Sequence, residues 1–323
     1  MFQRHEDDVI DFIASEIDLD NQNVLEVGCG QGGFLKRLAF KKKCFCTGFD
    51  PSYVSDGCDV FEDGDRFRVF TEFFNKSSYA EVRRPVKLVI WRHVIEHCPD
   101  PLGALEDIVN VFEPDDSFYL YIETPDADWI LSNGMYYDFV YEHCSLFTMG
   151  SLVSLLNRVG LDAVKSARMF DGQYLAVLAK PANDIKCTAE ISESSAVTEL
   201  HQTVMAARDV KTRVIGCLTD LCRAGGICVW GAGAKGIMFV NMYDENREFI
   251  VCLCDVNPHK QGAFAAHTAH PIIAPNELRS YNVKTILVLN GNYVNEISRH
   301  EDIIDEGFVI IDFERWMKKS FGA

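Results

Sequence analysis

The stretch NVLEVGCGQGGFL, residues 23–35, decides the fold of this chain. An apolar strand runs into a glycine-rich turn, and the turn runs into a helix. Gly28, Gly30 and Gly33 have the spacing of a nucleotide-binding turn, in which the backbone bends tightly and approaches a ligand closely. This spacing alone is weak evidence for any particular ligand.

Two carboxylates near this turn make the prediction more specific. Glu26 stands two residues before the first glycine, where dinucleotide-binding strands usually stay apolar. A carboxylate there can hold a cationic amino group and repels a pyrophosphate, so it favours a zwitterionic ligand with an amino acid moiety. Asp50 ends the next strand, residues 44–50, at the usual distance for a carboxylate that binds ribose hydroxyls.

These residues together resemble motifs I and II of the class I S-adenosylmethionine-dependent methyltransferases. The resemblance implies a doubly wound α/β sheet and S-adenosyl-L-methionine as methyl donor. Phe73 follows a third strand at residues 66–70, where an aromatic ring can cover an adenine face, although a core aromatic fits equally well. A Rossmann-type turn that binds another nucleotide remains the alternative.

Length and composition restrict the classes of function. A chain of 323 residues suits two domains, and 48% hydrophobic residues suffice for two packed cores. The net charge of −17 argues against broad binding to nucleic acids or anionic membranes. No apolar run approaches the ~20 residues that span a bilayer, and the N-terminus lacks a signal-peptide core. We therefore expect a cytoplasmic monomer or homodimer that acts on a small molecule.

The twelve cysteines include no Cys-x-x-Cys pair, and most stand in apolar segments. Buried free thiols are therefore a better interpretation than a zinc site. A second metal pattern is His93-Val-Ile-Glu-His97, which matches the inverzincin motif. It directly follows an apolar strand at residues 86–91, where a methyltransferase lines its donor pocket. We expect Arg92 and His93 to border the cofactor, His97 to face the acceptor, and no bound metal.

The opening pattern recurs at residues 227–236, ICVWGAGAKG, with its three glycines at the same spacing as in the first turn. Asp255 ends the following strand, as Asp50 does in the first copy. No acid precedes these glycines, and Lys235 lies inside the turn. Backbone amides at a helix N-terminus with an adjacent ammonium suit a phosphate. A degenerate unit that only packs is the alternative.

These units predict two Rossmann-like domains. We expect a donor-binding domain at residues 1–182, a linker and long helix at 183–226, and a second domain at 227–323. The aromatic-rich residues 129–148 are expected to line the cleft between the two domains.

The order of motifs resembles that of the sugar C-methyltransferases, which methylate a ring carbon of a nucleotide-activated ketosugar. Family members carry segments similar to residues 142–148, EHCSLFT, to 231–236, GAGAKG, and to 255–262, DVNPHKQG. Two features depart from the family. This chain starts directly at the helix before the first turn, without a cysteine-rich zinc-binding domain, and Val140 stands where the family has an active-site tyrosine.

The resemblance implies site residues for the acceptor. His143 is the expected base, with Glu142 orienting it or helping as a second base. Tyr141 or Tyr174 is expected to assist. From the sequence alone, a histidine in an aromatic loop is more often structural. The residues expected to bind the acceptor are His97, Tyr174, Gly231, Gly233, Lys235, Gly236 and Asp255. Other functions left open are O- or N-methylation of a small metabolite, nicotinamide-dependent oxidoreduction through the second turn, and non-catalytic sensing.

Overall fold

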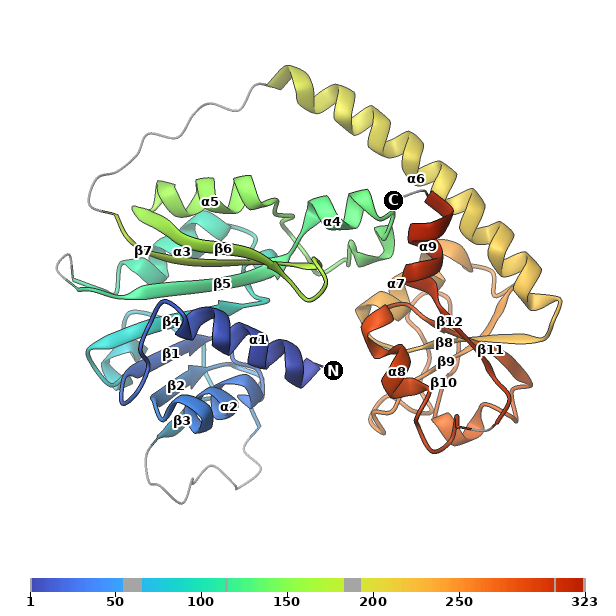
Figure 1. The fold of residues 1–323 in the computed structure, drawn as a ribbon, viewed down its shortest axis with the longest axis horizontal. Helices are drawn as coiled ribbons and strands as arrows, with labels where there is room; N and C mark the ends of the chain where they lie inside the picture. The colour runs from blue at the N-terminus through green and yellow to red at the C-terminus, as the bar shows by residue number, and fades with distance from the viewer. Residues whose placement is uncertain (1, 55–65, 114–115, 183–192, 305, 322–323) are drawn as a thin grey trace. The chain divides into compact units, whose positions relative to one another are not determined.

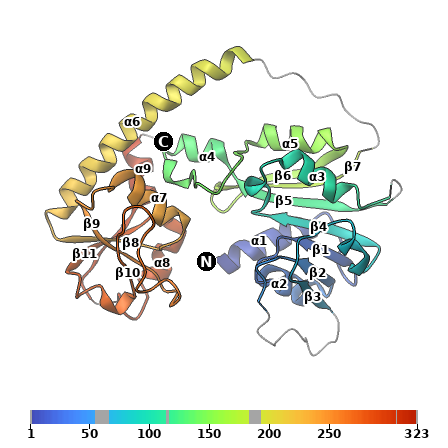
Figure 2. The ribbon, with the colours of Figure 1, turned by 180° about the vertical axis from the view of Figure 1, so that it is seen from behind.

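A computed structural model describes residues 2–54, 66–113, 116–182, 193–304 and 306–321, shown from two sides in Figures 1 and 2. The chain forms two compact units. The first contains residues 2–127 and 142–190, and the second contains residues 128–141 and 191–323. Each unit is built around its own β-sheet.

The first unit has a seven-stranded sheet of order β3-β2-β1-β4-β5-β7-β6. Only β7 is antiparallel to its neighbours β5 and β6. The strands are β1 (Asn23–Val27), β2 (Phe45–Phe49), β3 (Phe67–Phe70), β4 (Val86–Arg92), β5 (Tyr119–Pro125), β6 (Leu161–Met169) and β7 (Tyr174–Pro181). Because the strand order reverses between β1 and β4, the expected ligand crevice lies at their carboxyl ends. This is the doubly wound α/β fold predicted from the sequence.

Helices cover both faces of this sheet (Figure 1), which explains why its central strands are apolar throughout. Helices α1 (Phe2–Ala14) and α2 (Gly33–Lys42) pack on one face. Helices α3 (Pro101–Val109) and α5 (Met149–Arg158) pack on the other, together with the short helix η1 (Ser78–Glu81). Helix α1 begins at Phe2, and its first turns bury His5 inside the unit.

Local sequence signals fix where the helices on this second face begin. The Asp100 side chain accepts a hydrogen bond from the Gly103 N–H at 3.0 Å, and Pro101 occupies the first turn of α3. Thr148 and Ser151 form a reciprocal capping box at the start of α5. Phe147, directly before this cap, forms an isolated β-bridge with Asp126, just after β5.

The second unit has a five-stranded parallel sheet of order β10-β9-β8-β11-β12. Its strands are β8 (Gly226–Trp230), β9 (Ile250–Cys254), β10 (Ile272–Ile273), β11 (Val283–Val288) and β12 (Val309–Asp312). Helices α6 (Glu193–Cys222), α7 (Ala234–Tyr243) and α9 (Phe313–Phe321) contribute to the core on one face. The helix α8 (Val294–Ile297) and the short helix η4 (Pro275–Glu277) lie on the other side, with η5 (Gly291–Tyr293) preceding α8.

A segment from the middle of the chain belongs to this second unit. Residues 128–141 contain most of α4 (Ala127–Ser132) and the short helix η3 (Tyr136–Asp138). The Tyr137 ring is buried against Phe239 and Phe313, and its hydroxyl donates a hydrogen bond to the Leu289 carbonyl at 3.0 Å. The structure therefore divides the chain differently from the predicted boundaries. The expected cleft-lining stretch splits, with 128–141 in the second unit and 142–148 in the first.

Several cysteines pack as small apolar side chains. Cys228, Cys252 and Cys254 are fully buried in the second sheet. Burial and the neighbouring thiols raise the pKa of Cys228 well above its usual value, so this thiol stays neutral. Ten cysteines in the described part of the chain are free thiols.

The two glycine turns share one construction. The Asp50 carboxylate accepts a hydrogen bond from the Gly30 N–H at 2.7 Å, and Asp255 accepts one from the Ala232 N–H at 2.8 Å. In the second turn, a Cβ on Gly236 would lie 2.0 Å from the Gly231 carbonyl oxygen, so helix and turn approach too closely for any side chain.

This contact gives a stability prediction. We expect Gly236→Ala to lower the free energy of unfolding of the second unit by about 1–3 kcal/mol, because backbone atoms must move to admit the methyl group. Gly233→Ala is the matched control, since that position has open space and a negative φ. Differential scanning calorimetry of both variants measures the effect. Equal melting temperatures would show that the close approach is not required.

Candidate functional site

A cavity of about 600 Å³ lies at the carboxyl ends of β1 and β4. The structure brings all the residues predicted to bind the cofactor to its wall. They are Glu26, Gly28, Gly30, Gly33, Asp50, Phe73, Arg92 and His93. His97, predicted to face the acceptor, also lines it. Gly28 and Gly30 adopt positive φ angles of 73° and 54°, which carry the chain sharply from β1 toward α2.

The cavity contains an unpaired acceptor and an unpaired donor. Glu26 is buried, and its Oε2 has no hydrogen-bond partner among the described residues. The buried Arg92 Nε also lacks one, although its Nη2 donates to Glu123 Oε1 at 3.2 Å. Buried polar atoms without partners are costly, so both are suited to a ligand. An ammonium for Glu26 and a carboxylate for Arg92 match the amino acid end of S-adenosyl-L-methionine.

Burial raises the pKa of Glu26 to about 7, although the positive charge of Arg92 opposes the rise. At neutral pH, Glu26 is therefore present in both its protonated and its ionised form. A bound ammonium would stabilise the charged form. Binding of an ammonium at this position would therefore be accompanied by partial loss of the Glu26 proton.

Asp50 and Phe73 provide groups for the nucleoside end. The two Asp50 oxygens accept hydrogen bonds from the Gly30 N–H and from the N–H and hydroxyl of Ser52. Burial opposes the charge of Asp50, but these donors outweigh it and lower its pKa. Each carboxylate oxygen can accept further hydrogen bonds, so ribose hydroxyls remain suitable partners. The Phe73 ring is 75% exposed at the cavity, where its face is open to a base.

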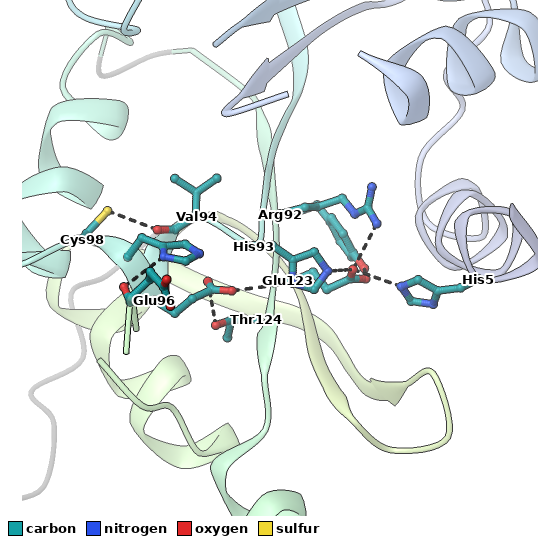
Figure 3. Close-up of polar contacts among 11 residues, drawn as sticks. His5, Arg92, His93, Val94, Glu96, Cys98, Glu123 and Thr124 are labelled. Atoms are coloured by element: carbon teal, nitrogen blue, oxygen red, sulfur yellow. Dashed lines mark hydrogen bonds and ion pairs between the residues drawn. The ribbon is translucent and has the colours of Figure 1, made fainter. Parts of the chain in front are cut away.

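Glu123, at the carboxyl end of β5, contacts Arg92 and His93, two residues of the cavity wall (Figure 3). Its Oε1 lies 3.1 Å from His5 Nε2, 3.2 Å from Arg92 Nη2 and 2.8 Å from His93 Nε2. The Tyr121 hydroxyl donates to Oε2 at 2.8 Å. Burial alone would raise the pKa of Glu123, but the positive charge of Arg92, hydrogen bonds to His5 and His93 and the charge of His93 hold it well below its usual range. Glu123 and His5 were missed by the sequence interpretation. The sequence feature that could have indicated Glu123 is its position as an acid at the end of an apolar strand.

His93 is a cation at neutral pH and not a base. Burial disfavours its charge, but Glu123 and Glu96 outweigh burial and raise its pKa to about 9. Its φ angle of 53° turns the chain between β4 and the short helix η2 (Ile95–His97). Because η2 is a three-residue 3₁₀-helix, His93 and His97 do not share an α-helical face. The inverzincin arrangement is therefore absent from this segment.

His97 and His143 meet edge to face, with ring centroids 4.9 Å apart. His97 Nδ1 lies 3.0 Å from the backbone carbonyl of Glu142. His143 Nδ1 is buried and has no hydrogen-bond partner among the described residues. Burial lowers the pKa of His143, which keeps the imidazole neutral at pH 7. A neutral imidazole beside the donor cavity can accept a proton from a neighbouring carbon or heteroatom.

The other residues predicted to assist His143 lie differently. The Tyr141 side chain is 92% exposed and belongs to the second unit. Tyr174 stacks on Phe170 and contacts the edge of His93, which places it beside the Glu123 cluster. The Glu142 side chain is exposed. The backbone carbonyl of Glu142 contacts His97, at the Nδ1 atom.

In the second unit, Gly231, Gly233 and Gly236 belong to the second turn, and Asp255 accepts a hydrogen bond from the Ala232 N–H within that turn. Lys235 Nζ, however, lies 2.8 Å from Asp138 Oδ2 of the inserted segment. Asp138 is buried, and burial raises its pKa although Lys235 opposes the rise. The ammonium predicted to meet a phosphate thus already has an anionic partner. No spacing in the sequence indicates this pair.

Fold and cavity together define a class I methyltransferase, and comparison with known families agrees. Residues 2–166 match the family described as "Methyltransferase domain", and residues 187–311 match "C-methyltransferase C-terminal domain". The chain belongs to the methyltransferase-domain family and is an S-adenosyl-L-methionine-dependent methyltransferase.

Among individual proteins, the chain is similar to the C-methyltransferase NovU of Streptomyces niveus. The two are 26% identical over 318 residues, which cover 92% of this chain and 73% of NovU.

Among solved structures, magnesium protoporphyrin IX methyltransferase (ChlM) from Synechocystis PCC 6803 with bound SAH is 14% identical, with a TM-score of 0.44 over 56% of this chain and 84% of that one. The 1,6-didemethyltoxoflavin-N1-methyltransferase of Burkholderia thailandensis is 15% identical, with a TM-score of 0.43 over 55% and 79% of the two chains. Within the described residues, no helix is both long and apolar enough to cross a bilayer.

The raised pKa of Glu26 predicts pH-dependent cofactor binding. Between pH 7.5 and 6.0 most Glu26 becomes protonated and loses its attraction for the ligand ammonium. We expect the affinity for S-adenosylhomocysteine to fall roughly five- to tenfold over this window, in proportion to the ionised fraction. Isothermal titration calorimetry measures it. Glu26→Gln should bind more weakly with no such slope, and a similar slope in this variant would assign the titration to another group.

The Lys235–Asp138 pair predicts a coupling energy. Lys235→Met leaves Asp138 buried without its cation and should cost about 1–3 kcal/mol of unfolding free energy. Adding Asp138→Asn should recover part of that loss, because the uncompensated charge is removed. A double-mutant cycle by urea unfolding measures the coupling. Strictly additive effects would mean that the pair contributes nothing.

Proposed function

We propose that this enzyme transfers a methyl group to a carbon atom of a nucleotide-activated ketosugar, with His143 as the base. The observation that carries the proposal is the unpaired, buried nitrogen of His143 beside His97, a residue of the donor cavity wall. Support for carbon as the acceptor comes from the match to the C-methyltransferase C-terminal domain and from the similarity to NovU.

The chemistry explains why a base is needed. S-adenosyl-L-methionine supplies an activated methyl group on a sulfonium, and the sulfur leaves as a neutral thioether. A carbon beside a ketone becomes nucleophilic only when one of its protons is removed, so a base near neutral pKa must stand close to it. Positioning the carbon in line with the methyl group contributes further, roughly 7–11 kcal/mol in favourable cases.

The roles of the two histidines follow from their contacts. His97 is oriented by its Nδ1 contact with the Glu142 carbonyl, so its Nε2 is the nitrogen available to the cavity. It is suited to hold the acceptor oxygen. His143 has a free Nδ1 and therefore takes the proton. Tyr174 and Tyr141 are weaker candidates as helpers, because Tyr174 packs on His93 and Tyr141 is exposed.

The nucleotide end of the acceptor is assigned to the second domain, at the turn formed by Gly231, Gly233 and Gly236 with Asp255. Because Lys235 is paired with Asp138, its charge is already partly neutralised. The backbone N–H groups at the start of α7 are then the main donors for a phosphate.

An O- or N-methyltransferase for a small metabolite is the second candidate, since the neutral imidazole of His143 would serve it as well. Carbon methylation and O- or N-methylation are distinguished by using an acceptor that carries deuterium on the carbon beside the ketone. Carbon methylation requires loss of that deuterium, whereas O- or N-methylation retains it. Mass spectrometry of the product distinguishes the outcomes, after thermal-shift screening of nucleotide sugars has identified a binder.

The base assignment predicts a selective defect. We expect His143→Ala to lower kcat by roughly 10²–10⁴ while the affinity for S-adenosylhomocysteine changes less than twofold, because His143 lies outside the donor cavity wall. Single-turnover kinetics and calorimetry measure the two quantities. His267→Ala is the control, an exposed histidine of the second unit. Full activity of the His143 variant would remove it from the mechanism.

A further inference from the structure

Three metal-ligand side chains converge beside the donor cavity. Ligand atoms of Glu96, His97 and His143 all lie within 4.8 Å of one another. They come from η2 and from the loop before α5, so no local spacing in the sequence indicates the set. We propose that these three residues form a binding site for one divalent transition-metal cation of the zinc class.

The chemistry of the set is that of known metal centres. Two imidazoles and one carboxylate hold zinc in several hydrolases and suit other first-row cations. Bonds of about 2.0–2.2 Å place neighbouring ligand atoms about 3 Å apart, so modest side-chain rotations suffice to close the present separation. Three protein ligands leave at least one position open for an oxygen ligand such as water or a carbonyl.

The surrounding contacts orient these ligands. His97 Nδ1 lies 3.0 Å from the Glu142 carbonyl, and donation there leaves the Nε2 lone pair free for a cation. The Thr124 hydroxyl donates to Glu96 Oε2 at 3.0 Å, which leaves Oε1 (Figure 3). Histidine and carboxylate ligands of metals are characteristically held in this way. His93 Nδ1, 3.6 Å from Glu96 Oε1, is the group that a cation must displace.

His143 supplies the observation that points to a ligand. Its buried Nδ1 has no partner among the described residues, which is costly unless something occupies the site. Cys144 lies beside the cluster, with its Sγ 3.5 Å from the His97 carbonyl. Burial, and after it the charges of Glu96 and Cys144, raise the pKa of the Cys98 thiol. These thiols are the rival ligands that an experiment must separate from the proposed set.

Occupation of this site has a consequence that rests on the proposed function. A cation bound to His143 uses the lone pair that the base needs, so metal binding and proton removal exclude each other. The metal should therefore inhibit methyl transfer without preventing cofactor binding.

Cobalt(II) titration of the full-length, chelator-treated protein tests the site. We expect one equivalent to bind with weak visible d–d absorption, as nitrogen and oxygen ligands give. Glu96→Gln and His97→Gln should each weaken binding at least tenfold, while His267→Gln, which alters an exposed histidine paired with Glu245, should not. A thermal shift with S-adenosylhomocysteine establishes that each variant is folded.

Two results would overturn the site. One is the absence of any cobalt spectrum. The other is an intense thiolate charge-transfer band that disappears in a Cys98→Ser, Cys144→Ser double variant, which would assign the metal to sulfur.

A separate activity measurement tests whether metal binding at this site prevents proton removal by His143. Added zinc should suppress turnover in the wild type, whereas stimulation would refute the exclusion. If no nucleotide sugar is methylated by the metal-free enzyme, the proposed function fails, and the cobalt spectrum still decides the metal site.

Discussion

The buried carboxylate of Glu123 is the constraint on which the donor site depends. It joins three elements that are distant in sequence, because His5 of α1, Arg92 and His93 at the end of β4, and β5 all meet at it. An isolated carboxylate at this depth would be prohibitively costly, so its hydrogen-bonding and charged partners must be buried together with it. Their arrangement leaves Arg92 with one unpaired nitrogen in the cavity. The groups that hold the first unit together therefore also shape the ligand site.

Much of the first unit was predictable from sequence, for physical reasons. The turn at Gly28 and Gly30 needs positive φ angles, which glycine adopts readily. Apolar strands that alternate with helices permit few sheet topologies. Residues at the carboxyl ends of neighbouring parallel strands must then converge, which is why Glu26, Asp50 and Arg92 line one cavity. His5 could not be placed in this way. It contacts Glu123, which is more than a hundred residues away in sequence, and no local periodicity indicates that the two residues pair.

The second unit shows a different limit. Its turn has the same glycine spacing as the turn of the first unit, and it is likewise followed by a helix and by an acid at the end of the next strand, Asp255. These features correctly indicated a second Rossmann-like sheet. The same pattern also indicated that the Lys235 ammonium suits a phosphate. In the structure, this ammonium is paired with the carboxylate of Asp138. Spacing fixes backbone geometry, but the charge balance of a site depends on which distant segment packs against it.

That packing segment makes the chain cross between the units three times, near residues 127, 141 and 190. Neither unit is a contiguous piece of polypeptide. During synthesis, residues 128–141 leave the ribosome long before the helices that bury Tyr137 exist, so they must stay without their core until α7 and α9 have been made. Final assembly of the second unit is thus delayed until α9 has been synthesised, and any truncation between the two sheets separates η3 from the core that holds it.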